Sequence, residues 1–292
     1  MQTVADNLQE MAAEIENLLE KLLLNQSSIY QRFVTNDRSP TVIGLNLYAY
    51  QDLGEKGRQI QGKLLERYRR FYSLLATLLS EQPKDTLQTL SRLDKKLTET
   101  IEQQPTDHKT VQEALEEAKR LLIGQVALLK RLYDVSAGEP VYVLDTSALI
   151  HNPNLEKWAF ADTPRFTLVL LPTVLAELDS LKTEHHNRDV RDKAKKIIRM
   201  MKEYSRRGSL ADGVPLVKGR SSVVAIAVDP DMSTTLPWLH SDVPDDRILA
   251  NTIEIMRSRP RTPVVLITAD FNLQNKASFA RIPALDPPDP AQ

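Results

Sequence analysis

Four acidic side chains stand at junctions between predicted strands and helices in the second half of this 292-residue sequence. Two of them directly follow short β-branched runs, one lies about one helical turn past such a run, and one opens a predicted helix. They are Asp145, Glu177, Asp245 and Asp270. In an open parallel sheet, ligands gather beyond the carboxyl ends of the strands. The pattern therefore predicts that these carboxylates meet at one edge of a sheet.

Such a cluster has a defined chemistry. Like charges a few ångströms apart repel one another unless cations are bound between them. Carboxylate oxygens are hard ligands that suit Mg²⁺ or Mn²⁺. These ions lower the pKa of a bound water and stabilise an in-line phosphoryl displacement, so phosphodiester hydrolysis needs no protein nucleophile. The sequence contains no cysteine, and this chemistry does not require one.

Each acid also has a structural alternative. An aspartate at a strand end can cap the following helix, and Asp245 with Asp246 suits a helix N-terminus electrostatically. Glu177 can be a solvated position beside an apolar stripe. The coincidence of four acids at four such junctions favours the site over four separate structural roles.

The elements around the acids indicate an α/β fold. Short β-branched runs alternate with helical patterns, which is typical of a parallel sheet with crossover helices. The runs are Val141–Leu144, Thr167–Leu171, Val223–Val228 and Val264–Ile267. Gly138 and Pro140 mark a boundary in front of the first run. We therefore predict an α/β domain over residues 140–286, followed by a flexible proline-rich tail over 287–292.

The first 139 residues carry a different periodicity, with apolar residues in steps of three and four. Four helices are predicted, with a capping-box pair, Thr110 and Glu113, near the start of the last. The stripes cover Val4–Leu22, Ile60–Leu79, Leu87–Ile101 and Val111–Leu132, and polar Gln125 occupies one slot of the fourth. The pattern indicates an all-α bundle or an extended coiled coil, which could drive homo-oligomerisation or recruit a protein partner.

Composition excludes several classes of protein. Lys and Arg number 38 against 39 Asp and Glu, for a net charge of −1, so any nucleic-acid surface must come from local patterning. No apolar run reaches the length of a membrane span, and residues 1–10 do not resemble a secretion signal, so we expect a cytoplasmic protein. The segment Gly57–Lys63 has the spacing of a phosphate loop, but Leu64 replaces the magnesium-binding hydroxyl and a helical stripe runs through it. ATP binding is not expected.

A basic stretch follows the Glu177 segment. Between Lys182 and Arg207 the sequence contains ten basic residues and only four acidic ones. This stretch could track the phosphates of a single-stranded substrate beside the acids, or it could be an ordinary solvated helix. The residues predicted to bind substrate are Arg188, Arg191 and Lys195, with His185 and His186 as further candidates.

Four segments together resemble the PIN domain family and occur in that family's order. They are Val143–Ile150, Pro172–Asp179, Pro244–Ala250 and Thr268–Leu273. The resemblance covers about residues 141–285 and is closest to PIN domains fused to PhoH-type ATPases. It implies an α/β/α sandwich with a central parallel sheet and a ribonuclease activity that depends on Mg²⁺ or Mn²⁺.

The resemblance also assigns roles to individual residues. Asp145 matches the first-strand metal ligand, Glu177 the acid on a helix, and Asp245 and Asp270 the later two acids. Thr146, Ser147 and Thr268 are supporting positions, and Asn272 could orient an acid or a bound water. Asp246 stands where this subgroup often has asparagine, so either Asp245 or Asp246 is the third ligand, and the register with Arg247–Leu249 favours Asp245.

The function expected from the sequence is a metal-dependent endoribonuclease acting on single-stranded RNA. RNA as the substrate rests on the resemblance alone. The alternatives are a catalytically weak PIN fold that binds RNA or protein, and a helical scaffold to which the PIN fold is auxiliary. Structure-specific DNA nucleases with a related fold carry large extra helical elements, and free-standing PIN toxins lack so long a helical region in front.

Overall fold

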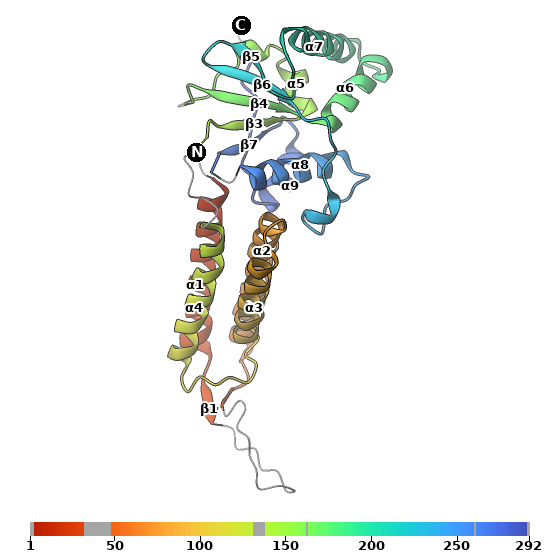
Figure 1. The fold of residues 1–292 in the computed structure, drawn as a ribbon. Coiled ribbons are helices and arrows are strands. Elements are labelled where there is room, and N and C mark those ends of the chain that lie inside the picture. The colour runs from red at the N-terminus through yellow and green to blue at the C-terminus, as the bar shows by residue number, and fades with distance from the viewer. Residues whose placement is uncertain (1–2, 32–47, 131–137, 162, 260, 291–292) are drawn as a thin grey trace. The chain divides into compact units, whose positions relative to one another are not determined.

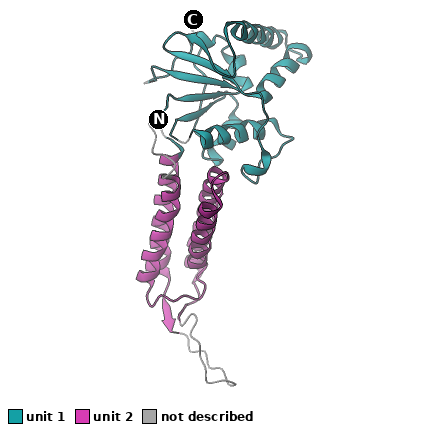
Figure 2. Cartoon of the chain, in the orientation of Figure 1, with its two compact units in different colours: residues 1–4, 135–292 teal, residues 5–134 magenta. Residues whose placement is uncertain are grey.

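The computed structural model describes residues 3–31, 48–130, 138–161, 163–259 and 261–290. The chain divides into two compact units (Figure 2). One comprises residues 5–134 and is called the helical unit. The other comprises residues 1–4 and 135–292 and is called the α/β unit.

The described part of the helical unit consists mainly of long helices (Figure 1), together with two short antiparallel strands, β1 and β2. In this unit, α2 packs against α3 and α3 against α4. Lys119 of α4 forms ion pairs with Glu16 at 2.9 Å and Glu20 at 2.5 Å on α1. The elements are α1 Val4–Gln26, β1 Ile29–Gln31, β2 Tyr48–Tyr50, α2 Glu55–Leu79, α3 Lys84–Ile101 and α4 Val111–Lys130. The helical interpretation of this half is confirmed, and the expected end of the last helix at Leu132 lies outside the described residues.

The apolar stripes of these helices form the core of the helical unit. Leu8, Ile15 and Leu22 of α1 are almost fully buried, as a stripe with seven-residue steps requires. The phosphate-loop-like segment lies inside α2, where Gly57 and Gly62 are helical residues. The antiparallel pairing of β1 with β2 was not predicted, because each strand is only three residues long.

Gln125 of α4 is a fully buried polar residue in this core, and Thr77 of α2 is another buried one. The Nε2 of Gln125 donates a hydrogen bond of 2.7 Å to the hydroxyl of Tyr68, which in turn donates to Asp94 Oδ1 at 2.9 Å. Burial is the main cause that raises the pKa of Asp94 above its usual value, and the hydrogen bonds from Tyr68 and Thr98 oppose the rise. The Nε2 donor of this polar slot is therefore matched by a partner on α2, whereas the buried Oε1 of Gln125 has no hydrogen-bond partner among the described residues.

In its described residues the α/β unit contains a six-stranded, mostly parallel sheet flanked by helices, which confirms the predicted α/β fold. The strand order is β5-β6-β4-β3-β7-β8, and all neighbours are parallel except β5 and β6. The strands are β3 Val141–Leu144, β4 Phe166–Leu170, β5 Val214–Val217, β6 Ser221–Ala225, β7 Val264–Ile267 and β8 Ala284–Leu285. Every residue of β3 and β7 is buried, which explains their unbroken apolar sequence.

Antiparallel β5 departs from the predicted parallel sheet. Only a short turn separates β5 from β6, and a parallel pair would need a crossover of a dozen or more residues. Gly219 has a φ of +74° in this turn, a conformation that favours glycine. The predicted strand Val223–Val228 is displaced in the structure, where the strand covers Ser221–Ala225.

In the α/β unit, helices follow β3, β4, β6 and β7, whereas β5 and β6 are joined without a helix. Among these helices, α5, α6 and α7 pack together, α8 packs against β7, and α9 against β8. They are α5 Thr146–His151, η1 Leu155–Lys157, α6 Pro172–Glu184, α7 Arg188–Arg207, η2 Met232–Thr234, α8 Pro244–Ser258 and α9 Phe271–Phe279. The predicted acids lie at or near the N-terminal ends of α5, α6, α8 and α9. Three of these helices follow a strand, and α8 follows a loop.

The C-terminal segment is tethered to the α/β unit. Buried Asn152 donates hydrogen bonds from Nδ2 to the carbonyls of Pro288 at 2.9 Å and Asp289 at 3.3 Å. The predicted flexible tail, 287–292, is thus held at these two residues, and residues 291–292 lie outside the described part. Among the described residues, no helix has both the length and the apolar character needed to cross a membrane.

Candidate active site

The carboxyl ends of β3, β4 and β7 are in register with one another. Leu144 of β3 pairs with Leu170 of β4 on one side and with Ile267 of β7 on the other. The residue after β3 continues the ladder, because the backbone N–H of Asp145 donates to the carbonyl of Ile267 at 3.0 Å. The residues that follow these three strands therefore emerge at the same edge, which is where the predicted acids were expected.

Asp145 is buried at this edge and held by four hydrogen bonds. Oδ1 accepts from the backbone N–H of Thr146 at 2.6 Å, and Oδ2 accepts from that of Ser147 at 3.2 Å. Oδ2 also accepts from two hydroxyls, Ser147 Oγ at 2.5 Å and Thr268 Oγ1 at 2.8 Å. Asp145 thus caps α5, as its structural alternative requires, and its carboxylate is also fixed across the strands by Thr268, 123 residues away in the sequence.

Glu177 lies on α6, five residues after the helix starts at Pro172. Thr146 Oγ1 donates a hydrogen bond to its Oε2, so Glu177 is joined to the residue that follows Asp145. Burial is the largest cause that raises the pKa of Glu177, and the negative charges of Asp145 and Asp245 raise it further. The Thr146 hydrogen bond and the positive charge of Arg247 act in the opposite direction. Glu177 therefore lies within electrostatic range of two other predicted acids.

Asp270 follows β7 and caps α9. Its Oδ1 accepts from the backbone N–H groups of Asn272 at 2.7 Å and Leu273 at 3.3 Å. Its own N–H donates to Thr268 Oγ1 at 3.0 Å, so the same hydroxyl contacts Asp145 and Asp270. Asp270 is exposed, which leaves its side chain accessible to solvent beside the buried Asp145.

The two consecutive acids of α8 face different surroundings. Asp246 is buried, with its side chain 6% exposed, and accepts from the backbone N–H of His240 at 3.0 Å. The Asp245 side chain is 29% exposed, lies 3.4 Å from Asn272 Nδ2, and is one of the charges that raise the pKa of Glu177. Asp245 is thus the more exposed of the two acids and the one whose charge acts on Glu177, whereas Asp246 is buried against the His240 segment.

The supporting positions all contact one of the acids. Thr146 contacts Glu177, Ser147 and Thr268 contact Asp145, and Asn272 contacts Asp245. Ser147 Oγ also accepts from the backbone N–H of Ala269 at 2.9 Å, which joins the start of α5 to the segment after β7. The four acids, Asp145, Glu177, Asp245 and Asp270, are called the acid group from here on.

Residues 142–287, half of the chain, match the PIN domain family. The chain belongs to the PIN domain family. No curated protein matches the chain. PIN domains are generally nucleases that use divalent metals, and RNA binding is implied at the same general level.

The donor chemistry of the acid group in this PIN domain fits a hard divalent cation. The group offers carboxylate oxygens from the β3, α6, α8 and β7 regions, with no softer ligand among them. In the described part of the chain, no three His, Asp or Glu side chains are already gathered as a metal-binding group. Protein donors orient several of these carboxylates, and a carboxylate oxygen that accepts one hydrogen bond keeps a lone pair for a cation.

Two cations that the sequence interpretation missed lie beside the acid group. Lys276 Nζ lies 3.4 Å from Asp245 Oδ2 and 2.8 Å from Asp246 Oδ1. Burial lowers the pKa of Lys276, but the neighbouring carboxylates outweigh it and the pKa is raised overall. Arg247 is close enough to lower the pKa of Glu177, and its buried Nε has no hydrogen-bond partner among the described residues. The helical spacing from Asn272 to Lys276, four residues, could have indicated that both face α8.

The basic residues predicted to bind substrate are engaged elsewhere. Arg188 and Lys195 each lie 3.7 Å from Asp192 on the same helix, α7. Arg191 donates to the carbonyls of His185 and His186 and so satisfies the end of α6. The described contacts of these three residues do not reach the acid group. Substrate binding by Arg188, Arg191 and Lys195 stays a prediction, and their ion pairs fit the alternative of a solvated helix.

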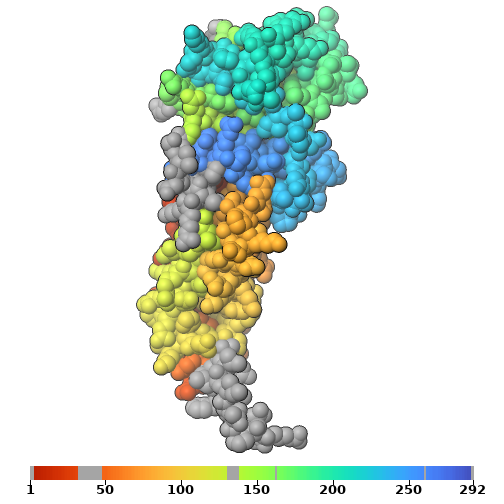
Figure 3. Space-filling model, viewed as in Figure 1, coloured from red at the N-terminus to blue at the C-terminus, as the bar shows by residue number. Residues whose placement is uncertain are grey.

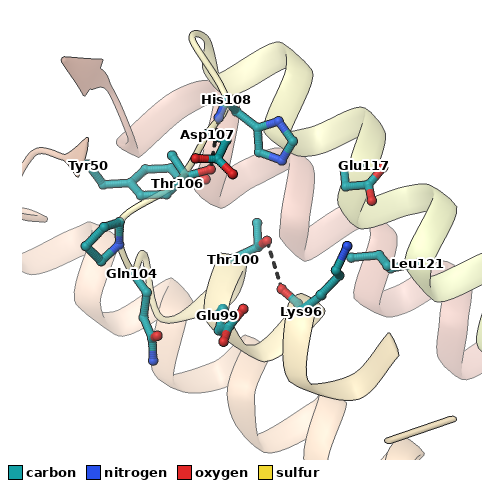
Figure 4. A pocket seen from close by; sticks show the side chains of 11 residues that line it. Tyr50, Lys96, Glu99, Thr100, Gln104, Thr106, Asp107, His108, Glu117 and Leu121 are labelled. Atoms are coloured by element: carbon teal, nitrogen blue, oxygen red, sulfur yellow. Dashed lines mark hydrogen bonds between the residues drawn. The ribbon is translucent and has the colours of Figure 1, made fainter. Parts of the chain in front are cut away.

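A separate pocket of about 300 Å³ lies within the helical unit (Figure 4). It is formed between α3, α4 and the segment that joins them, and Thr100 Oγ1 donates to the carbonyl of Lys96 at 3.1 Å beside it. Its charged lining mixes Lys96 and His108 with acids, so no single sign of charge selects a ligand. The acids are Glu99, Asp107 and Glu117. This pocket contains none of the residues of the acid group.

Proposed function

We propose that this PIN domain is a Mg²⁺- or Mn²⁺-dependent endoribonuclease that hydrolyses phosphodiester bonds of single-stranded RNA. The observation that carries the proposal is the joining of acids from distant segments by one set of contacts. Thr146 and Thr268 connect Asp145 to Glu177 and Asp270, and Asn272 connects α9 to Asp245. Membership of a family of nucleases supports the same reaction class.

In this proposal the acid group holds the cation. When bound, Mg²⁺ or Mn²⁺ supplies an activated water and stabilises the oxygens of the phosphoryl displacement. Asp145 contributes a carboxylate whose direction is fixed by four donors. Glu177, whose charge is disfavoured by burial and by two neighbouring acids, gains most from a nearby positive charge.

Two substitutions test the proposal directly. Asp145→Asn and Asp270→Asn each keep the size of the side chain and remove its charge. We expect each to lose cleavage of a single-stranded RNA by a hundredfold or more, about the loss that follows when one electrostatic catalytic contact is removed. Asp189→Asn, on exposed α7, is the matched control and should cut as the unaltered chain does. Equal rates for all four proteins, with no effect of a chelator, would exclude this mechanism.

The second candidate function is a PIN fold that binds RNA or protein with negligible catalysis. One observation favours it: the described residues contain no assembled group of three metal-binding side chains, and Lys276 already contacts Asp245. Calorimetric titration with Mn²⁺ separates the two candidates. Heat of binding that disappears in Asp145→Asn supports the nuclease, and no heat at millimolar Mn²⁺ supports the binding module.

The helical unit is proposed to drive homo-oligomerisation or to recruit a protein partner, or to act as the functional scaffold. Ile123 of α4 is 63% exposed and lines a small groove between α1 and α4. Light scattering of the full chain, with Ile123→Lys as the variant, tests self-association through this helix. The closeness to PIN domains fused to PhoH-type ATPases, the cytoplasmic location and the boundaries at residues 139 and 286 also remain proposals.

A further inference from the structure

Phe271 is an exposed aromatic residue at the start of α9. Its exposed fraction is 74%, the highest among the large apolar side chains of the described residues. A phenylalanine stabilises the folded state mainly through burial of its ring, so an exposed phenylalanine contributes little to the free energy of folding. Its ring makes no contact with another ring or with a cation among the described residues. The fold therefore does not account for an aromatic side chain at this position.

A second phenylalanine on the same helix shows the contrast. Phe279, at the other end of α9, is 47% exposed and packs edge-on against Trp238 with ring centroids 5.1 Å apart. Leu273 and Ala277 are buried and anchor α9 to the core. Because α9 is held by these residues, the ring of Phe271 is available at the surface without a packing role.

The position of Phe271 relates it to the acid group. It is bonded directly to Asp270, and Asn272 on its other side contacts Asp245. Side chains of a helix lean toward its N-terminus, so the ring of the first helical residue covers the surface around the preceding cap, Asp270. Blue C-terminal segments of the chain reach the surface on the face that the space-filling view shows (Figure 3). An accessible aromatic face thus adjoins the exposed acid of the site.

From this placement we infer that Phe271 is a stacking platform for a nucleobase of the RNA strand, next to the phosphodiester that is cut. Every base has a π-face, so such a platform binds single strands without reading their sequence. A base in a duplex is already stacked on its neighbours, so the platform favours single-stranded over double-stranded RNA. The inference rests on the proposed function and adds to it a residue that selects unpaired substrate.

The first experiment measures RNA binding by fluorescence anisotropy. The full chain is titrated into a short fluorescein-labelled oligoadenylate, with Ca²⁺ in place of Mg²⁺, and a gel then confirms that the RNA is intact. Phe271→Ala should weaken binding about 5- to 100-fold, which is the range for loss of one base–aromatic stack. Phe271→Trp should bind as tightly as the unaltered chain, and Phe271→Leu should fall between them. Phe279→Ala is the matched control and should leave RNA affinity unchanged.

The second experiment locates the stacked base. A series of the same oligonucleotide carries a single abasic residue at successive positions. At one position the abasic residue should weaken binding to the unaltered chain and have no further effect on Phe271→Ala, because the two changes remove the same contact. Additive losses at every position would overturn the inference, since they mean that no base stacks on Phe271.

The outcomes separate the inference from the proposed function. If the unaltered chain neither binds nor cuts RNA, the proposed function fails. If it binds and cuts RNA but Phe271→Ala matches it in affinity, the function stands and the stacking role is excluded. If Phe271→Leu binds as tightly as Phe271→Trp, the contact is only apolar, and the surface then fits a protein partner better than a base.

Discussion

Thr268 offers the sharpest test of how the site is held together. Its Oγ1 donates to Asp145 Oδ2 at 2.8 Å, accepts from the N–H of Asp270 at 3.0 Å, and lies 3.1 Å from Ser147 Oγ. Thr268 is fully buried, so water cannot replace the hydroxyl. Thr268→Val keeps the shape of the side chain and removes these contacts together.

The loss of stability expected for Thr268→Val follows from its hydrogen bonds to the Asp145 carboxylate and to the backbone N–H of Asp270. A bond to a charged group contributes about 1.5–3 kcal/mol and a neutral one about 0.5–1.5 kcal/mol, so the unfolding free energy should fall by roughly 2–4 kcal/mol. For a domain of this size that corresponds to a fall of about 4–16 °C in the Tm of the α/β unit. Because Asp145 loses one of its four donors, Mn²⁺ affinity should also fall, by about 10- to 100-fold.

Thr167→Val is the matched control for this experiment. Thr167 lies on β4 of the same sheet, and its hydroxyl contacts only Ser222 Oγ, at 3.1 Å, in the described contacts. Thermal unfolding and Mn²⁺ calorimetry are measured for both variants and the unaltered chain. The control should lose little stability and no metal affinity. If Thr268→Val behaves as Thr167→Val does in both measurements, the hydroxyl does not hold Asp145 and the reasoning is refuted.

Two further predictions concern the charges of the two units. Lys276→Met removes the cation shared by Asp245 and Asp246, so the Tm without metal should fall. Because Lys276 would compete with a bound ion, Mn²⁺ should raise the Tm of the variant more than that of the unaltered chain. An equal rise in both proteins would show that Lys276 and the ion do not compete. In the helical unit, burial raises the pKa of Asp94, so its ionised form costs folding free energy above the unfolded-state pKa of about 3.9 and not below it. Asp94→Asn should therefore gain Tm over the unaltered chain as the pH rises from acid to neutral, and a difference that shrinks on that path contradicts the assignment.

Local patterns in the sequence were sufficient to place most elements. Apolar periodicity predicted the four long helices, and unbroken β-branched runs predicted β3 and β7, because a buried strand needs an apolar side chain on both faces. The same patterns placed Asp145 and Asp270 shortly after strands; in the structure Asp145 directly follows β3 and Asp270 is the third residue after β7. β8 has only two residues, too few for a pattern to be seen, and Pro215 interrupts the apolar sequence of β5, which argues against a strand.

Tertiary structure decided which side chains the acids contact. The sequence shows Asp245 and Asp246 side by side. Only the contacts of α8 with α6, with side chains of α9 and with the His240 segment bury Asp246 and leave Asp245 near Glu177. Charge counting along α7 predicted a substrate surface, and only the structure shows that Arg188 and Lys195 lie near Asp192 and that Arg191 contacts the segment after α6. Lys276, more than a hundred residues from Asp145, enters the site only because α9 follows the strand beside β3. Residue types and local spacing thus determined the helices and strands and the acidic side chains available for metal binding. Long-range packing determined which side chains those acids contact, because hydrogen bonds and ion pairs depend on distances that no local period fixes.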